Sequence, residues 1–350
     1  MIILGIETSC DETSAAVVTK NPKDAKVKIL SNVVASSLSL HAKTGGIIPK
    51  EAAREQVKFI IPVIKKAIEN SKTKIDNLDA IAVTVGPGLI GSLLVGVETA
   101  KVLAYVWKKP IVPVNHLIGH IYANWLTTTS KQQLTPNENL DIVFPALALI
   151  VSGGHTDLVL IKNHGKIKWL GGTRDDAAGE AFDKIGRLLG LPYPGGPAIE
   201  KASKLGDASL FTFPRPMIYS KDFDFSFSGL KAAVARDVKT MKQLNNETIA
   251  DLSSSIQEAI IDVLVSKTLK AAQKYNAKSI LLGGGVAANQ KLRDQLILNT
   301  KYLMPNTAIF APQKSLCTDN AAMIASTAFY NYKEVSWQNI TANPELYFLV

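Results

Sequence analysis

The chain has 350 residues, of which 47% are hydrophobic and 20% charged. This composition excludes an intrinsically disordered chain and supports a sizeable core in one large or two medium domains. Two cysteines, Cys10 and Cys317, are too few for a disulfide framework and are typical of a reducing cytosol. The densest apolar run, at 144–151, has only the length of a strand, and the first residues lack the pattern of a signal peptide. We therefore expect a cytoplasmic protein that makes no use of a membrane.

The formal net charge is +9, from 39 basic and 30 acidic residues. An excess of positive charge favours contact with phosphates, and RNA is one candidate. The alternative is a lysine-rich solvated surface, because the charge is spread along the chain and forms no long basic run. No pattern typical of a small RNA-binding module is present. The charge alone leaves both interpretations open.

The first half of the chain is predicted to contain a strand, a polar turn and a second strand, followed later by a strand, a glycine-rich turn and a helix. Apolar periodicity predicts strands at 2–7, 13–19, 27–38 and 80–85, and helices at 50–70 and 90–108. The polar stretch at 126–140 interrupts this pattern. It predicts a surface insertion near a lobe boundary.

The second half repeats that order in outline. Strands are expected at 146–151, 157–161 and 279–282, and helices at 179–189, 248–275 and from about 288. An α/β fold with two similar lobes, each a mixed sheet flanked by helices, is the simplest architecture for this order. We expect an N-terminal lobe of 1–130 plus about 315–350, a C-terminal lobe of 140–314, and an insertion at about 126–142. Duplication is inferred from element order only, because the halves share no persuasive residue-level repeat.

Four glycine-containing turns follow apolar segments, at 86–88, 152–154, 195–196 and 283–285. Glycine allows backbone N–H groups to approach an anion closely, and the dipole of a following helix favours negative charge. One such turn is weak support for any ligand, but four indicate a nucleotide-type ligand. None matches the P-loop or the dinucleotide fingerprint, which disfavours a P-loop kinase and a dehydrogenase.

A pair of histidines, His116 and His120, stands four residues apart. On a helix both imidazoles share one face and can bind the same metal ion; the alternative is a pair of core or capping histidines. The zinc metalloprotease motif has Glu at the position of Leu117, which disfavours hydrolysis of that kind. A third, oxygen-bearing ligand must come from elsewhere, and Asp319 is the best acidic candidate.

An acidic run at 175–183 leads into the helix expected from 179. Asp175 or Asp176 can cap this helix, and Asp183 can pair with Arg187 on a solvated face. An aspartate beside a nucleotide can instead accept hydrogen bonds from both ribose hydroxyls. The sequence does not choose between these roles.

Together these segments resemble the bacterial TsaD family, once called O-sialoglycoprotein endopeptidase. The matching motifs span nearly the whole chain in the family's order: GIETSCDETS at 5–14, the histidine pair, VSGGHT at 151–156, DDAAGEAFDK at 175–184, FSFSGLK at 225–231, GGGVAAN at 283–289 and CTDN at 317–320. The resemblance implies the two-lobed fold of actin, heat-shock chaperone ATPases and sugar kinases (ASKHA), with ligand in the cleft between the lobes.

The resemblance also implies the reaction and its site. Threonylcarbamoyl would pass from threonylcarbamoyl-AMP to the N6 amine of the adenosine 3′ of the anticodon (position 37), in tRNAs reading codons that begin with A. Three residues resemble the metal ligands, for Fe(2+) or alternatively Zn(2+): His116, His120 and Asp319. The set that resembles the adenylate site is Ile150, Val151, Ser152, Gly153, Gly154, Asp183, Gly196 and Asn289. The archaeal and eukaryotic branch has a metal-binding tyrosine where this chain has Ile150, so the fourth metal ligand stays open.

The donor is a mixed anhydride and is already activated, so the reaction needs no nucleophilic Ser or Cys. The enzyme must orient the amine and stabilise charge on oxygen. Asp11 and Glu12 are candidates for handling the amine proton, and the alternative is a role as turn residues. The implied partners are tRNA, TsaB-type and TsaE-type proteins, and a TsaC-type enzyme that supplies the donor. Two rival functions are a metalloprotease (sialoglycoprotease) and a non-catalytic nucleotide-binding scaffold.

Overall fold

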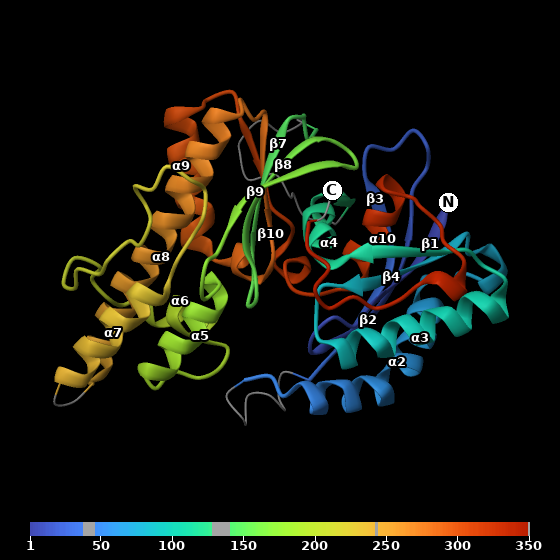
Figure 1. Cartoon of the computed structure of the whole chain (residues 1–350), viewed down its shortest axis with the longest axis horizontal. Coiled ribbons are helices and arrows are strands. Elements are labelled where there is room, and N and C mark those ends of the chain that lie inside the picture. The colour runs from blue at the N-terminus through green and yellow to red at the C-terminus, as the bar shows by residue number, and fades with distance from the viewer. Residues whose placement is uncertain (38–45, 128–140, 242–243, 349–350) are drawn as a thin grey trace. The chain divides into compact units, whose positions relative to one another are not determined.

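The structure is a computed structural model that describes residues 1–37, 46–127, 141–241 and 244–348. The chain divides into two compact units (Figure 1): unit 1 is Met1–Gln132 with Pro312–Val350, and unit 2 is Gln133–Ala311. Most of the expected insertion at 126–142 lies outside the described residues. Its first two residues, Leu126–Thr127, form a short strand, β6, beside β3.

Unit 1 is built on a mixed sheet with the strand order β5-β4-β1-β2-β3-β6. The other strands are β1 (Ile2–Glu7), β2 (Glu12–Thr19), β3 (Val27–Ser36), β4 (Ala80–Gly86) and β5 (Ile111–Asn115). The helices are α2 (Pro49–Ser71), α3 (Ile90–Trp107), α4 (His116–Tyr122) and α10 (Ala321–Tyr330).

Helices cover both faces of this sheet, which explains why its central strands are apolar on both sides. Along β1, Leu4 and Ile6 belong to one buried cluster with residues of α2 and α3. Ile3 points the other way and belongs to a second cluster with residues of α10. The period-two alternation of a strand thus supplies two cores from one segment.

Unit 2 has a second mixed sheet with the order β11-β10-β7-β8-β9. Its strands are β7 (Ala146–Val151), β8 (Thr156–Asn163), β9 (Lys166–Gly172), β10 (Ser279–Gly283) and β11 (Ala308–Phe310). Its helices are α5 (Ala178–Leu188), α6 (Gly195–Ser203), α7 (Ser228–Thr240), α8 (Asn246–Lys274) and α9 (Gln290–Leu303).

The two sheets repeat one topology. In each, the first strand pairs antiparallel with the second and parallel with the fourth: β1 with β2 and β4, and β7 with β8 and β10. The order β5-β4-β1-β2-β3 therefore corresponds to β11-β10-β7-β8-β9. The predicted α/β class with two mixed sheets flanked by helices is confirmed.

Of the roles left open for Asp175 and Asp176, capping of the following helix is not the one observed. The residue before α5 is Ala177, and the first N–H group of that helix, on Ala178, donates a 2.8 Å hydrogen bond to the Thr156 hydroxyl. The Asp175 carboxylate instead accepts hydrogen bonds of 2.8 and 3.3 Å from two backbone N–H groups at the start of α7. Asp176 lies between two lysines, 2.6 Å from Lys184 Nζ and 2.5 Å from Lys231 Nζ. Both carboxylates therefore join α5 to α7.

Helix α3 is long and apolar enough to meet the length and hydropathy criteria for a membrane span. Apolar helices that pack in the core of a soluble protein also meet these criteria. Leu93, Val97 and Ala100 of α3 are fully buried against the sheet. The exposed side carries an ion pair of 2.9 Å between Glu98 and Lys101.

Candidate functional site

Capped helix ends position the predicted metal ligands of unit 1. α4 begins directly after β5, and the Asn115 side chain caps it by accepting hydrogen bonds of 2.8 and 3.2 Å from its first turn. This cap fixes the direction in which His116 and His120 leave the helix. Asp319 precedes Asn320, which caps α10 through a hydrogen bond of 3.1 Å from Met323 N–H. His116 and Asp319 therefore lie at or next to a capped helix start, and His120 lies one turn further along α4.

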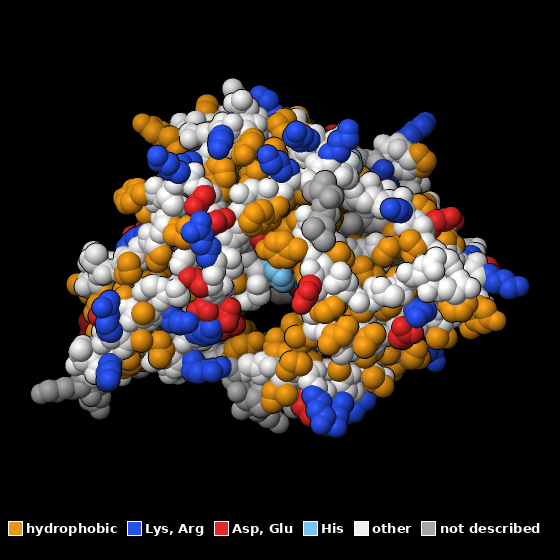
Figure 2. All heavy atoms as spheres, viewed as in Figure 1, with side chains coloured by type: hydrophobic (Ala, Val, Ile, Leu, Met, Phe, Trp, Pro, Cys, Tyr) orange, Lys and Arg blue, Asp and Glu red, His pale blue; other side chains and the backbone are white. Residues whose placement is uncertain are grey.

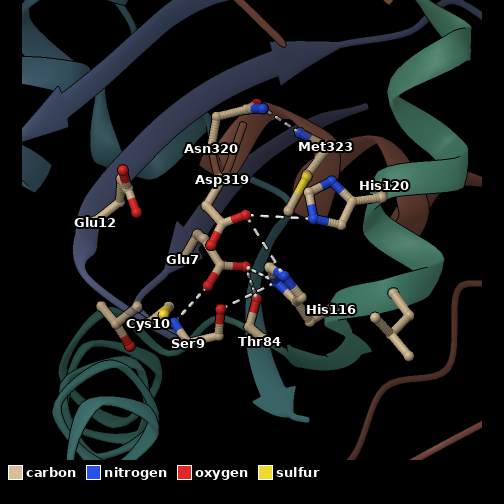
Figure 3. A network of polar contacts seen from close by, with 12 residues as sticks. Glu7, Ser9, Cys10, Glu12, Thr84, His116, His120, Asp319, Asn320 and Met323 are labelled. Carbon is tan, nitrogen blue, oxygen red and sulfur yellow. Dashed lines mark hydrogen bonds and ion pairs between the residues drawn. The ribbon is translucent and has the colours of Figure 1, made fainter. Parts of the chain in front are cut away.

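The three residues meet in one cluster (Figure 3). Asp319 Oδ1 lies 3.6 Å from His116 Nε2 and 3.3 Å from His120 Nε2. One potential ligand atom from each residue falls within 4.8 Å of the others. Both histidines are buried. The structure thus brings together the histidine pair and the distant aspartate that the sequence singled out.

The cluster fits a divalent metal ion. Nδ1 of His120 is buried and has no hydrogen-bond partner among the described residues, and Nε2 makes no well-formed hydrogen bond there, although it lies 3.3 Å from the Asp319 carboxylate. Leaving a buried ring nitrogen unsatisfied costs about 1–3 kcal/mol, and a bond from that nitrogen to a metal removes the cost. Two imidazoles and one carboxylate suit Zn(2+) and also the facial triad of non-haem Fe(2+). The donor set supports a metal without distinguishing these two.

A fourth residue, Glu7, belongs to this centre and was missed from the sequence. Glu7 Oε2 lies 3.0 Å from His116 Nδ1 and accepts a 2.6 Å hydrogen bond from the Thr84 hydroxyl. When Nδ1 donates its hydrogen to Glu7, Nε2 is left as the ligand atom on the side of Asp319. A fully buried carboxylate at the end of an apolar strand requires partners, and this was the available signal.

The electrostatics of the two imidazoles differ. Burial acts to lower the pKa of His116, but the carboxylates of Asp319 and Glu7 outweigh it and raise this pKa to about 9. Burial lowers the pKa of His120. His120 is therefore neutral, as a ligand must be, whereas a metal competes with a proton for His116.

The other predicted residues of unit 1, Asp11 and Glu12, lie in and after the turn between β1 and β2. Gln56 of α2 holds this turn, because its Nε2 is 3.0–3.3 Å from the carbonyls of Thr8, Cys10 and Glu12. Burial, and then the charge of Asp319, raise the pKa of Glu12 to about 10. At neutral pH Glu12 therefore carries a proton and can donate a hydrogen bond but not accept a proton.

Two predicted glycine turns of unit 2, at 152–154 and 283–285, lie where β7 and β10 end. These two parallel strands are neighbours, and Gly283 pairs with Ile150. A Cβ on Gly284 would lie 2.3 Å from the Val151 carbonyl oxygen, so only glycine permits this approach. Around Gly153 and Gly154 a Cβ would meet nothing within 4 Å, and both are exposed. Ligands of open α/β sheets bind outside the carboxyl ends of parallel strands, which is where these turns lie.

Asp183, in the middle of α5, and Asn289, at the start of α9, each hold the start of a helix in the same unit. Asp183 Oδ1 accepts a hydrogen bond of 2.6 Å from Gly195 N–H at the start of α6, in the turn that includes Gly196. Burial raises the pKa of Asp183. Asn289 caps α9, accepting a 3.0 Å hydrogen bond from Leu292 N–H. Neither side chain is a simple solvated surface group.

Comparison with known proteins gives a consistent result. A family model described as TsaD, tRNA N6-adenosine threonylcarbamoyltransferase, matches residues 28–326. A protein of that name from Syntrophomonas wolfei is 46% identical over 342 residues, covering 98% of this chain and 96% of its own. One from Dehalococcoides mccartyi is 50% identical over 332 residues, covering 95% and 94%. One from Listeria monocytogenes is 47% identical over 348 residues, covering 99% and 96%.

Among solved structures, the HypF protein of T. kodakarensis is similar with a TM-score of 0.59 and 14% identity, covering 94% of this chain and 47% of that one. At this identity the likeness concerns the fold alone. The family match and the close relatives cover almost the entire chain, from the sheet of unit 1 to α10. The chain belongs to the TsaD family, the tRNA N6-adenosine threonylcarbamoyltransferases.

Proposed function

We propose that this chain transfers the threonylcarbamoyl group from threonylcarbamoyl-AMP to the N6 amine of the adenosine 3′ of the anticodon (position 37), in tRNAs that read codons beginning with A. The observation that carries this proposal is the match of the TsaD family model over residues 28–326. In the reaction, a bond forms between N6 and the carbamoyl carbon. The bond from that carbon to the phosphate oxygen breaks, AMP leaves, and the amine loses one proton.

In this proposal His116, His120 and Asp319 hold one divalent metal, with Fe(2+) preferred over Zn(2+). When bound, the metal supplies Lewis-acid polarisation of a substrate oxygen. Glu7 orients His116 through Nδ1 and so keeps Nε2 available. Asp11 is the proposed acceptor of the amine proton, since Glu12 is already protonated at neutral pH.

We propose that unit 2 binds the adenylate part of the donor through Ile150–Gly154, Asp183, Gly196 and Asn289. The exposed backbone of Gly153 and Gly154 supports this, because its N–H groups can approach an anion closely. Asp183 fixes the start of α6, beside Gly196, by accepting a hydrogen bond from Gly195 N–H.

The rival functions have less support. A zinc peptidase of the HExxH type uses the Glu of that motif as general base, and this chain has Leu117 there. A non-catalytic nucleotide scaffold has no use for a His–His–Asp cluster in which both histidines are buried and His120 has an unsatisfied ring nitrogen. No observation specifically favours either function.

We propose TsaB-type and TsaE-type proteins as partners and a TsaC-type enzyme as the source of the donor. We place the reaction in the cytoplasm. An apolar surface on α2 and α3 supports a protein partner on unit 1 (Figure 2). Five apolar side chains there are more than half exposed: Val57, Ile61, Val102, Tyr105 and Val106. Their spacings of three and four residues place them on one side of each helix. A TsaB-type protein covering this surface would remove it from water.

The test incubates the purified chain, with its proposed partners, with threonylcarbamoyl-AMP labelled in the threonine and with a tRNA that reads a codon beginning with A. We expect label in the tRNA and release of AMP. A tRNA with guanosine at position 37 is the control and should stay unlabelled. Equal labelling of both tRNAs, or no labelling of either by a metal-loaded complex, would overturn the proposal. Cleavage of a glycoprotein substrate in its place would favour the peptidase.

A further inference from the structure

A buried row of polar side chains joins three helices of unit 2. Gln257 lies in the middle of α8, and its Oε1 accepts a 2.8 Å hydrogen bond from Asn289 Nδ2. Its Nε2 donates a 2.8 Å hydrogen bond to Ser203 Oγ at the end of α6. These three residues are 4%, 6% and 9% exposed, so water does not substitute for the hydrogen bonds between them. The row thus links α6, α8 and the start of α9.

The backbone N–H of Leu292, at one end of the row, fixes which atom is donor and which is acceptor in each hydrogen bond of the row. Leu292 N–H can only donate, so the atom of Asn289 that it meets is the oxygen. Nδ2 of Asn289 must then donate to Gln257 Oε1, and Gln257 Nε2 to Ser203. The Ser203 hydroxyl completes the sequence by donating to the carbonyl of Glu200 at 3.0 Å. Neither amide can flip without breaking two hydrogen bonds.

We propose that Gln257 is a positioning residue of the nucleotide site, acting through Asn289. Gln257 takes one of the two Nδ2 hydrogens of Asn289 and leaves the other for the ligand. The ligand atom that meets Asn289 is therefore a hydrogen-bond acceptor, such as a ribose oxygen or a ring nitrogen. The inference rests on the proposed function, in which Asn289 contacts the adenylate.

Burial gives Gln257 its influence over Asn289. If residue 257 offers no acceptor, one buried N–H of the Asn289 amide loses its hydrogen-bond partner. Rotation of the Asn289 side chain toward another acceptor then lowers its free energy. That rotation also removes the cap of α9, since the same amide accepts from Leu292. Asn289 lies a few residues after Gly284, which packs against the Val151 carbonyl. A rotation of the Asn289 side chain would therefore take place close to the proposed adenylate turns.

The experiment compares variants of the full chain in calorimetric titrations with a non-hydrolysable analogue of threonylcarbamoyl-AMP. We expect Gln257→Leu to weaken binding about tenfold or more, as for the loss of an oriented hydrogen bond. Gln257→Glu keeps an acceptor for Asn289 in either protonation state, and we expect affinity within about threefold of the parent chain.

The control is Thr268→Val, also on α8. Thr268 is fully buried, and among the described residues its hydroxyl bonds only within the helix, to the carbonyl of Leu264 at 2.7 Å. We expect this variant to lose thermal stability without losing affinity. In steady-state transfer assays Gln257→Leu should raise KM for the donor and leave KM for tRNA unchanged. A purely structural role of Gln257 would not produce that difference.

Asn289→Ala separates the two ways in which the inference can fail. If Asn289→Ala binds the analogue normally, the proposed role of Asn289 is wrong, and the inference falls with it. If Asn289→Ala weakens binding but Gln257→Leu behaves like Thr268→Val, only the inference is wrong. Equal losses in Gln257→Leu and Gln257→Glu would also overturn it, because the effect would then not depend on an acceptor.

Discussion

Two imidazoles and two carboxylates form one buried cluster beside the β1–β2 turn, and the two carboxylates have different positions in it. Asp319 approaches the Nε2 atoms of both histidines, within 3.3–3.6 Å. Glu7 lies on the other side of His116 and contacts Nδ1. Loss of Asp319 therefore removes a proposed ligand, whereas loss of Glu7 removes only the group that orients one.

This difference predicts a graded response of metal binding. We expect His116→Ala or Asp319→Ala to remove most bound metal and most transfer activity while the fold is retained. Glu7→Gln should weaken metal binding by roughly 10- to 100-fold, as is typical for residues that orient a ligand. The metal content of each variant after dialysis against a weak chelator measures the loss of ligands and the loss of the orienting group. Glu98→Gln, an exposed position on α3, is the control. Full occupancy in Asp319→Ala would refute the ligand assignment.

Glu12 gives a pH-dependent prediction for the metal-free protein. Its pKa of about 10 lies above the ordinary carboxyl value, so between these pH values the folded chain binds one proton more than the unfolded chain. The stability from this proton is complete below the ordinary pKa and is lost as pH rises toward 10. The Glu12→Gln variant has no such loss. Its Tm should therefore rise relative to the parent as pH increases from 5 to 9, and a constant difference would contradict the prediction.

Single-residue roles were predictable where the signal was local. His116 and His120 follow from a four-residue spacing on one helix. Glu7 did not follow, because its partner His116 is 109 positions away and joins β1 to α4 only in the folded chain. The role of Asp175 stayed open for the same reason, since its contacts with the start of α7 span 52 and 53 positions.

At the scale of elements, segments with a clear apolar pattern were predictable, and several segments without one were not. The helix expected at 50–70 is α2, and the strand expected at 146–151 is β7 with the same bounds. β9, α6 and α7 were missed. α6 opens with Gly195-Gly196-Pro197, residues that usually mark turns, and its start is held by a side chain from another helix, Asp183. Tertiary hydrogen bonds of this kind leave no local pattern.

The hydrogen bond from Gly195 to Asp183 gives a prediction about ligand binding. We expect Asp183→Ala to weaken binding of a threonylcarbamoyl-AMP analogue about tenfold or more, or ~1.4 kcal/mol. It should also lower the free energy of unfolding by about 1 kcal/mol, because the start of α6 loses its acceptor. Calorimetric titration and chemical denaturation measure the two effects.

Arg187→Ala is the matched control for Asp183→Ala. If Asp183 served only as a surface partner of Arg187, both variants would change stability by a few tenths of a kcal/mol and leave affinity alone. Normal affinity of Asp183→Ala would take this residue out of the adenylate site. The site would then depend on the glycine turns and Asn289.

At the scale of the molecule, the repeated sheet topology places function at equivalent edges. Glu7 ends β1, and His116 follows β5, so the metal cluster of unit 1 lies at the carboxyl ends of its parallel strands. In unit 2 the adenylate turns follow Val151 at the end of β7 and Gly283 at the end of β10. β1 and β7 hold the same place in their sheets. The proposed metal centre of unit 1 and the proposed adenylate turns of unit 2 thus lie at equivalent edges of one repeated topology.

The distribution of charge predicts how the chain meets tRNA. The net charge is +9, and some of the basic side chains are paired, as Lys58 is with Glu55 at 2.5 Å. On the β8–β9 hairpin, Lys162, Lys166 and Lys168 are exposed and have no ion pair among the described residues. Unpaired lysines gain most from a phosphate, because no protein carboxylate competes for them.

We therefore expect the affinity of the isolated chain for tRNA to be weak and to fall steeply with salt. The logarithm of the association constant should decrease linearly with the logarithm of salt concentration, by roughly 0.7–0.9 for each phosphate contact. Replacing Lys162, Lys166 and Lys168 by Gln should reduce this slope by about two units, whereas Lys58→Gln should leave it nearly unchanged. Fluorescence anisotropy of labelled tRNA between about 50 and 200 mM salt measures the slopes.

A salt-independent affinity would rule out phosphate contacts as the basis of binding. An unchanged slope in the triple variant would exclude the β8–β9 hairpin as a site of phosphate contacts. The slope reports the number of counterions released on binding, and this number does not depend on how tight the binding is.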